Sequence, residues 1–344
     1  MIKIYDLKQA ELWDNVVMSF AEYDVYYLSG YVKAFRIHGD GDPNLLYYEG
    51  DGLRAAYVYM KRTTDIEGCY DSITPYGYGG VIFDGDTSEN NLRVFWEAYT
   101  DKMRKESIVD NFVRYHPILG NSDPMRVVSD VTDMGKTVAF DLTSEKVIWN
   151  NITSKNRNMI RKAEKNGIEI FHGKDLGLFT TFRYIYNSTM DKDNAEEYYY
   201  FEDAFYESIH NDLYDNYEMF YAVCEGKIVA MSIVIFANNQ MHYHLSGSLS
   251  EYRHFAPSNL LLYKAALWGC EQGYKTFHLG GGVGSGEDNL YKFKAAFNRN
   301  SNYTFCIGKQ IFDQKKYEEL IALRKTSVSD FNENSSFFPL YRAS

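Results

Sequence analysis

The stretch Lys275–Asn298 reads KTFHLGGGVGSGEDNLYKFKAAFN, and we expect the rest of the chain to be organised around it. It opens with a short β-type run, Lys275–Leu279, and continues through five glycines within 280–286. After Asp288 the apolar residues recur at helical spacing. This order predicts a strand, a glycine loop and the start of a helix.

The predicted helix carries one lysine on its apolar side. At 100° per residue, the apolar face consists of Leu290, Phe293 and Phe297. Lys294 lies on that face, whereas Lys292 lies opposite, where a solvated lysine is expected. A lysine directed into a cleft beside backbone N–H groups suits the stabilisation of a developing oxyanion. The alternative is a lysine at the helix edge, whose stem covers apolar surface.

Asp288 precedes this helix and has two possible roles. An aspartate at this position predicts an N-cap. It is also the carboxylate nearest in sequence to Lys294, so it could accept the proton of an attacking ammonium group. The capping role is sufficient to explain the residue, and both roles stay open.

Length and composition limit the classes of protein that fit. A chain of 344 residues is long for one core and suits two domains. The net charge of −11 argues against wholesale coating of DNA or of an anionic membrane. Four cysteines form no C-x-x-C pair, which disfavours a zinc site and fits a reducing compartment. The N-terminus lacks the order of a signal peptide, and no apolar run reaches the ~20 residues of a membrane span. We expect a cytoplasmic protein without stable membrane insertion.

The first half predicts helices, a hairpin and an aromatic glycine loop. Its elements are expected at 8–20, 28–37 and 89–105 for helices, and at 45–49, 53–61, 69–74, 111–116 and 136–142 for strands. The loop Pro75–Gly80 reads PYGYGG and has high backbone freedom. It is either a ligand-facing loop, in which Tyr76 and Tyr78 contact an acceptor, or a tight turn with packed tyrosines.

The second half opens with a basic helix near 152–165. Arg157, Arg161 and Lys165 recur every four residues and form one ridge of positive charge. Such a ridge is usually a solvated helix face, but in an acidic chain it is also a candidate seat for phosphate. A helical aromatic segment is expected over 184–211.

A three-stranded meander and a helix precede the opening stretch. They are expected at 219–224, 227–236, 241–246 and, for the helix, 258–271. His242 and His244 share one face of the last strand and, with His278, raise the question of a metal. No carboxylate or cysteine completes a set, so we expect polar residues lining a cleft and no metal. A strand near 303–309 and a helix over 314–324 end the chain.

Both halves show the same order of elements without repeating a sequence. We therefore predict an α/β (α+β) protein with two tandem domains, each a mixed, mostly antiparallel sheet flanked by helices. We place the domains at 1–143 and 144–344, with about the last 25 residues packing back on the first domain.

This order resembles the GNAT acyltransferase fold, and its doubling resembles the FemABX peptidyltransferases. Two further passages carry the resemblance: AFDLTSEKVIWNNITSKNRNMIRKAEKNGIEI at 139–170, and HYHLSGSLSEYRHFAPSNLLLYKAALWGCEQGYKTFHLGGG at 242–282, followed by LYKFKAAF at 290–297. The first is similar to the family's entry into its second domain and the others to its core. In the first half the resemblance rests mainly on the hairpin and the PYGYGG loop.

The resemblance implies a bacterial enzyme of peptidoglycan biosynthesis. It would transfer an aminoacyl group from aminoacyl-tRNA to an amine of a UDP-linked or lipid-linked muramyl peptide, without a covalent intermediate or a tightly bound cofactor. Phe293 and Lys294 match the family's pair at the reacting carbonyl, where the lysine stabilises charge. The first domain would bind the acceptor, and the arginine ridge would hold phosphate of the precursor or of the tRNA end. Further substrate contacts are expected from Tyr243, His244, Arg253, Gly281 and Gly282.

The rival donor is acetyl-CoA or another acyl-CoA, used to acylate an amino sugar or similar amine. GNAT enzymes hold its pyrophosphate on an R/Q-x-x-G-x-G/A loop at a helix N-terminus. The matching loop here is Arg253–Ser258, in which both small positions are altered and Pro257 lacks an N–H group. This favours a donor other than CoA. A catalytically silent GNAT-fold binding module is the third hypothesis, and the glycine loop and Lys294 count against it.

Overall fold

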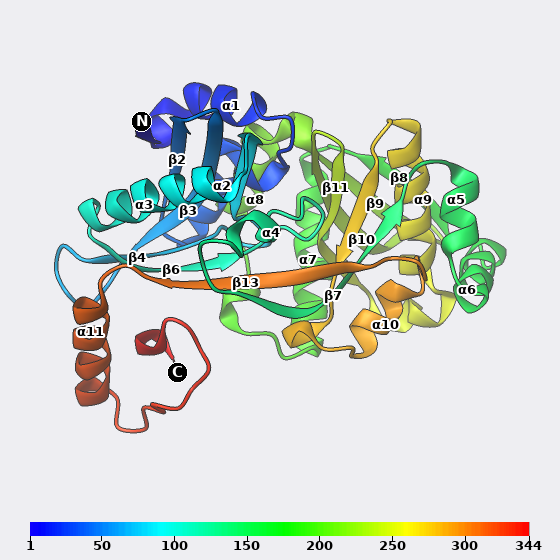
Figure 1. Cartoon of the computed structure of the whole chain (residues 1–344). Helices are drawn as coiled ribbons and strands as arrows, with labels where there is room; N and C mark the ends of the chain where they lie inside the picture. The colour runs from blue at the N-terminus through cyan, green and yellow to red at the C-terminus, as the bar shows by residue number, and fades with distance from the viewer. Residues whose placement is uncertain (344) are drawn as a thin grey trace. The chain divides into compact units, whose positions relative to one another are not determined.

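The computed structural model describes residues 1–343, which form two compact units (Figure 1). The first unit contains Met1–Met134 and the described residues from Phe305 on, and the second contains Gly135–Thr304. This division lies earlier than the predicted 143/144 boundary, and the returning segment is longer than the predicted 25 residues. The reason is strand pairing: β7 (Val131–Asp141) pairs with a strand of the second unit, and β13 (Tyr303–Ile311) pairs with one of the first.

The first unit is built on a mixed sheet in the order β1-β2-β3-β4-β6-β13, with β5 also paired to β3. Its neighbours are antiparallel except β4 and β6, which run parallel. The remaining strands are β1 (Ile2–Tyr5), β2 (Asp42–Gly50), β3 (Leu53–Thr63), β4 (Tyr70–Ile73), β5 (Val81–Gly85) and β6 (Ile108–Arg114). The α-helices are α1 (Ala10–Met18), α2 (Ser29–His38), α3 (Glu89–Lys105), α4 (Ser122–Met125) and α11 (Gln314–Ser327).

The main core of the first unit lies between α3 and the sheet, where Phe95 and Tyr99 are fully buried. A smaller cluster joins α11 to Val109 of β6 and to the C-terminal segment. Tyr341 anchors that segment, because its hydroxyl lies 2.7 Å from Asp110 Oδ2 and 3.1 Å from Asp71 Oδ2. These contacts hold the returning segment on the first unit.

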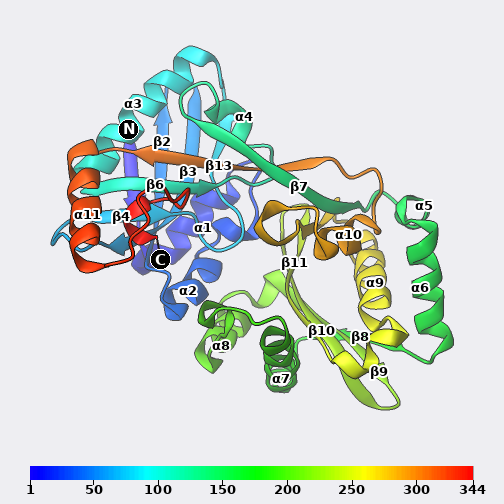
Figure 2. The ribbon, with the colours of Figure 1, turned by 90° about the horizontal axis from the view of Figure 1, so that it is seen from below.

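The second unit repeats this plan with the strand order β7-β12-β11-β10-β9-β8. Its parallel pair is β11 and β12, which are joined through α9. Besides β7, the strands are β8 (Glu169–Gly173), β9 (Tyr217–Cys224), β10 (Lys227–Ala237), β11 (Gln240–Ser248) and β12 (Thr276–Gly280). The helices are α5 (Glu145–Asn151), α6 (Ser154–Lys165), α7 (Gly177–Lys192), α8 (Asp203–Asp212), α9 (Pro257–Glu271) and α10 (Asn289–Ala295). Figure 2 shows α9, α5 and α6 on one side of this sheet and α7 and α8 on the other.

The predicted fold class, with mixed, mostly antiparallel sheet flanked by helices, is confirmed. Some local predictions differ from the structure. The expected helical segment 184–211 is two helices, α7 and α8, separated by an irregular stretch. The short strands β1, β5 and β8 had no strong sequence signal, because strands of four or five residues give little alternation to detect.

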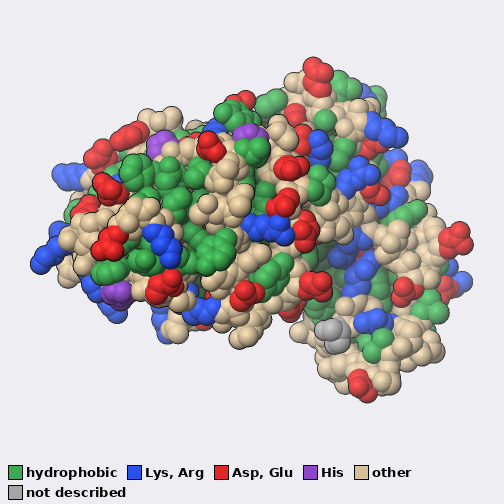
Figure 3. Space-filling model, turned by 180° about the vertical axis from the view of Figure 1, so that it is seen from behind, with side chains coloured by type: hydrophobic (Ala, Val, Ile, Leu, Met, Phe, Trp, Pro, Cys, Tyr) green, Lys and Arg blue, Asp and Glu red, His purple; other side chains and the backbone are tan. Residues whose placement is uncertain are grey.

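Both acidic and basic side chains lie on the surface, as expected for a chain that contains many residues of each charge. Over the face drawn in Figure 3, acidic and basic side chains are interspersed. Among the described residues, no helix is both long enough and apolar enough to cross a membrane.

Candidate functional site

The glycine loop follows β12 directly and is tied to the helix behind it by Asp288. One carboxylate oxygen of Asp288 accepts a hydrogen bond from the Tyr291 amide at 2.8 Å, which makes it the N-cap of α10. The other accepts from the Val283 amide at 3.1 Å. These bonds, the Tyr291 one first, lower the pKa of Asp288. The carboxylate is therefore suited to positioning the loop and poorly suited to taking up a proton near neutral pH.

Lys294 lies on the inner side of α10, as the helix geometry predicts. Only 9% of its surface is exposed, and its Nζ donates a hydrogen bond to the carbonyl oxygen of Gly281 at 2.7 Å. Burial lowers its pKa to about 8, with the charge of Asp288 opposing the shift. An ammonium group has three donors, so two remain after the bond to Gly281. Lys294 is thus a cation held at the carboxyl end of β12 with donors to spare.

The predicted apolar face of α10 is correct at Phe293 and Phe297 and wrong at Leu290. Phe297 is fully buried, and its ring packs edge-on against that of Phe293 at 5.3 Å. Leu290 is 40% exposed. The helix begins only at Asn289, so Leu290 lies in its first turn, outside the packed part of the face.

Two glycines of the loop are required by close approach. A Cβ on Gly282 would lie 2.2 Å from the carbonyl oxygen of Gly286 and 2.4 Å from Asp288 Oδ1. A Cβ on Gly281 would lie 3.0 Å from the carbonyl oxygen of Lys136 on β7. The loop is therefore folded tightly over the end of β12, and Gly281 presents its carbonyl to Lys294.

The parallel strands β11 and β12 stop pairing with each other close to this loop. Their pairing covers Gln240–His242 and Thr276–His278, whereas β11 continues to Ser248 and β12 to Gly280. Over that length β11 keeps its pairing to β10, and β12 keeps its pairing to β7. Beyond the last shared pair, the edge of β11 that faces β12 and the edge of β12 that faces β11 are no longer paired with each other. Their backbone N–H and C=O groups can therefore bind an extended substrate.

Tyr243 and His244 stand on β11 just beyond the last shared pair. Tyr243 packs against the core cluster that also contacts Phe293, and burial raises its pKa. His244 lies at a β-bulge of β11, because the pairing with β10 passes from Tyr243 directly to Leu245. Burial and the neighbouring His242 lower the pKa of His244 to about 3, so its ring is neutral at physiological pH.

Two arginines of the predicted basic ridge, Arg157 and Arg161, lie over the ring of Trp149. The guanidinium groups of Arg157 and Arg161 lie 5.9 Å and 5.2 Å from the ring centre of Trp149 on α5. Arg157 also donates to the carbonyl oxygen of Trp149 at 3.2 Å. Neither arginine forms an ion pair with a carboxylate of the described residues, so both charges remain available to an anion.

The loop before α9 has the left-handed backbone conformation of a glycine loop, although its small residues are altered. Ala256, the N-cap of α9, has φ +61° and ψ +44°, a left-handed conformation usually taken by glycine. Pro257 occupies the first helical position, where a missing N–H group costs least. Arg253 is exposed in the preceding 3-10 helix. The backbone at Ala256 is therefore the one that glycine takes in such loops, but Pro257 offers no N–H and the Asn259 N–H donates to the Ala256 carbonyl.

In the first unit, the PYGYGG loop is a turn with packed tyrosines. The ring of Tyr76 stacks on Phe35 at 5.2 Å, and the Tyr31 hydroxyl donates to the Tyr76 carbonyl at 2.7 Å. Tyr78 meets the ring of Tyr26 edge-on at 5.8 Å. Both loop tyrosines keep part of their surface exposed, so this packing leaves room for contact with a ligand.

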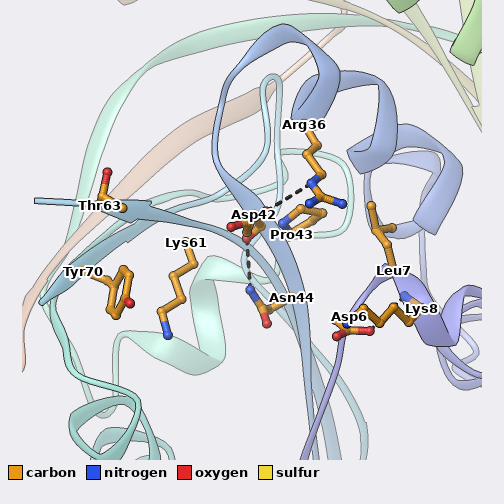
Figure 4. A pocket seen from close by; sticks show the side chains of 10 residues that line it. All are labelled: Asp6, Leu7, Lys8, Arg36, Asp42, Pro43, Asn44, Lys61, Thr63 and Tyr70. Carbon is orange, nitrogen blue, oxygen red and sulfur yellow. Dashed lines mark hydrogen bonds and ion pairs between the residues drawn. The ribbon is translucent and has the colours of Figure 1, made fainter. Parts of the chain in front are cut away.

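The first unit contains a cavity of about 380 Å³ that was not predicted from the sequence (Figure 4). Arg36 and Asp42 pair at 3.1 Å on its wall. Lys61 reaches into it from β3, and its Nζ lies 4.0 Å from the ring centre of Tyr70. Burial lowers the pKa of Lys61. The residues come from segments far apart in sequence, so no local pattern could have revealed them.

A protein-family model matches most of the second unit. Residues 154–294 match the model of the acetyltransferase (GNAT) domain. These residues include the strands β8 to β12, the glycine loop and Lys294. No curated protein matches the chain at a significant level.

Solved structures match almost the whole chain. The crystal structure of FemX aligns with a TM-score of 0.70 at 13% identity, over 93% of this chain and 99% of FemX. The C-terminal domain of a putative lysylphosphatidylglycerol synthetase from Agrobacterium fabrum aligns with a TM-score of 0.58 at 15% identity, over 94% and 96%. L-PGS from Bacillus licheniformis aligns with a TM-score of 0.53 at 13% identity, over 94% and 96%. The predicted resemblance to the GNAT and FemABX folds is confirmed.

Proposed function

We propose that this chain, an acyltransferase that carries a GNAT domain within a FemX-like fold, transfers an aminoacyl group to the primary amine of a muramyl peptide. The observation that carries the proposal is Lys294, a buried ammonium group fixed to the carbonyl of Gly281 with two further donors. Lysylphosphatidylglycerol synthetase neighbours share the fold and are named for another aminoacyl transfer.

In the proposed reaction, the neutral amine of the acceptor attacks the carbonyl carbon of the aminoacyl ester. A C–N bond forms, the ester C–O bond breaks, and the terminal tRNA hydroxyl leaves with a proton. Negative charge collects on the carbonyl oxygen in the transition state. Lys294 stabilises that charge with donors already in place, which is the efficient form of such catalysis.

Other residues position the substrates. Phe293 packs beside the reacting centre, and Asp288, Gly281 and Gly282 hold the loop that orients Lys294. Tyr243 and His244 lie on β11, just beyond its last pair with β12. No tightly bound cofactor is required, because the donor brings its own activated ester.

Further contacts to the substrates are expected in each unit. Arg157 and Arg161, which have no carboxylate partner among the described residues, would bind phosphate of a UDP-linked or lipid-linked precursor or of the tRNA acceptor end. In the first unit, Tyr76 and Tyr78 would contact the acceptor. We place the reaction in the bacterial cytoplasm, where charged tRNA and UDP-linked precursors occur.

A second candidate function is transfer from acyl-CoA to an amino sugar or another small amine. The left-handed Ala256 favours it, because this is the backbone conformation that glycine would take in a pyrophosphate-binding loop, and Arg253 is exposed next to it. A non-catalytic binding module is the remaining alternative, and it gives the buried ammonium of Lys294 no role.

The donor decides between these functions. Purified protein is incubated with a UDP-linked muramyl pentapeptide and either labelled aminoacyl-tRNA or labelled acetyl-CoA, and product is measured by mass. We expect aminoacylated muramyl peptide and protection against thermal unfolding by the peptide. Acetyl transfer with no response to the muramyl peptide would overturn the first function in favour of the second. Binding of the peptide without turnover of either donor would leave the binding module.

A further inference from the structure

A groove of about 850 Å³ separates α7 from α8 in the second unit. Its wall includes three carboxylates, those of Asp191, Asp203 and Glu207, and one guanidinium, that of Arg183. Arg183 is already paired, at 2.6 Å to Asp203 and 3.0 Å to Glu202 just outside the groove. The groove therefore carries excess negative charge.

Two polar atoms in this groove have no partner in the described structure. The Tyr206 side chain is 2% exposed, and its hydroxyl forms no hydrogen bond. The Oδ1 atom of Asn187 is also buried without a donor. Both residues line the groove. A buried polar atom without a partner destabilises the folded state, so each atom needs a partner that the described residues do not supply.

Packing accounts for the ring of Tyr206 but not for its hydroxyl. The ring contacts Phe179 at 5.7 Å and Phe182 at 5.8 Å, contacts that a phenylalanine would make equally well. Burial raises the pKa of the phenol, and the charges of Arg183 and Asp203 also act on it. Its hydroxyl thus lies near the charged wall of the groove and keeps its proton at physiological pH.

The helices themselves are held by other residues. The backbone of α7 at Ile185 and Tyr186 packs directly against Gly247 of β11. A Cβ at Gly247 would lie 2.7 Å from the Ile185 carbonyl oxygen, so this close approach requires glycine. Asn187 is not needed for that contact. An oxygen acceptor at Asn187, a hydroxyl at Tyr206 and nearby carboxylates together form a surface that receives hydrogen-bond donors with positive charge.

We propose that the α7–α8 groove binds a small organic cation that carries primary ammonium groups, of the polyamine or amino-sugar type. The ammonium donates to Asn187 Oδ1 and to the Tyr206 hydroxyl oxygen and pairs with Asp191 and Glu207. The exposed ring of Tyr184 covers the apolar part of the ligand. This site does not depend on the acyl transfer at Lys294.

Calorimetric titration of the full chain with spermidine and with glucosamine tests the proposal. We expect saturable binding of at least one, weakened by added salt, and the one that binds identifies the source of the ammonium. N-acetylglucosamine is the neutral match of glucosamine and should not bind. Absence of binding by both amines, or equal binding of N-acetylglucosamine, would overturn the proposal.

Two variants separate ligand binding from structure. Asn187→Leu and Tyr206→Phe should each weaken binding about tenfold or more, while the thermal midpoint stays equal or rises, because each removes an unpaired polar atom. Tyr214→Phe, which removes a hydroxyl outside the groove, should change neither. Unchanged affinity in both groove variants would overturn the proposal, as would a fall in affinity that only follows lost stability.

Discussion

The ammonium of Lys294 and the carbonyl of Gly281 are joined by a hydrogen bond of 2.7 Å. The two residues belong to α10 and to the loop after β12, so the bond connects the helix with the end of the strand. It fixes the position of the Lys294 charge without neutralising it. This arrangement gives the glycine loop and the lysine one common function, and the first four predictions below depend on it.

Replacing Lys294 should remove activity and leave the fold intact. Lys294→Met is expected to lower kcat by about 10² to 10³-fold, the usual effect of losing a donor to an oxyanion. Its thermal midpoint should equal or exceed that of the parent, because burying an ammonium group opposes folding. Lys292→Met, on the exposed side of the same helix, is the matched control. Full turnover in a folded Lys294→Met protein would remove this residue from the mechanism.

The pH dependence of turnover should report the same group. Burial lowers the pKa of Lys294 to about 8, so the ammonium is lost as the pH rises through that value. The acceptor amine must lose its proton, which makes the rate rise with pH on the acid side. We therefore expect a bell-shaped profile of kcat with an alkaline limb near pH 8. Steady-state rates measured from about pH 6 to about pH 10 test this, and a profile that keeps rising above pH 8 would contradict it.

Two neighbouring glycines should differ sharply in their tolerance of alanine. Gly282→Ala places a Cβ 2.2 Å from a backbone oxygen, so the loop must move. Such a displacement can lower kcat by up to about a hundredfold. Gly286→Ala meets its nearest atom at 3.6 Å, an ordinary contact, and should keep near-normal turnover. Equal kinetics of the two variants would show that the loop shape is not required.

Substitutions of Asp288 distinguish capping from proton transfer. Asparagine also caps helices but offers one acceptor oxygen, so Asp288→Asn should keep the bond to Tyr291, lose the bond to Val283, and keep more activity than Asp288→Ala if the residue only holds the loop. Asp288→Ala loses the bonds to Tyr291 and Val283 and should show a lower thermal midpoint and a lower kcat. A loss of activity in Asp288→Asn as large as in Asp288→Ala, at normal stability, would instead identify the carboxylate as a base.

Stability of the first unit should depend on pH through Asp110. Burial raises the pKa of this carboxyl to about 7, above its unfolded value near 4. The folded protein then binds a proton that the unfolded chain has lost, so the free energy of unfolding falls as the pH rises between these values. Urea unfolding at about pH 5 and about pH 8 should show a smaller decrease in Asp110→Asn. Asp123→Asn, at an exposed carboxylate, should behave like the parent.

Local features of the candidate site could be predicted from sequence because they depend on neighbouring residues. The strand, the glycine loop and the capped helix follow from short-range periodicity and from one aspartate. The inward side of Lys294 follows from helix geometry alone, and its burial agrees. The repeated order of hairpin, crossover helix and strand was also visible, because each element has its own local pattern.

Only the tertiary structure decided what depends on distant partners. The sequence predicted strands at 136–142 and 303–309 but not that each pairs within a different unit, since pairing is a non-local contact. The stacking of Arg157 and Arg161 on Trp149, the left-handed Ala256 and the unpaired atoms of Asn187 and Tyr206 likewise arise from packing. By itself, the sequence determined which residues form the loop and the helix. The fold determined that the lysine between them is buried, charged and held in place by Gly281.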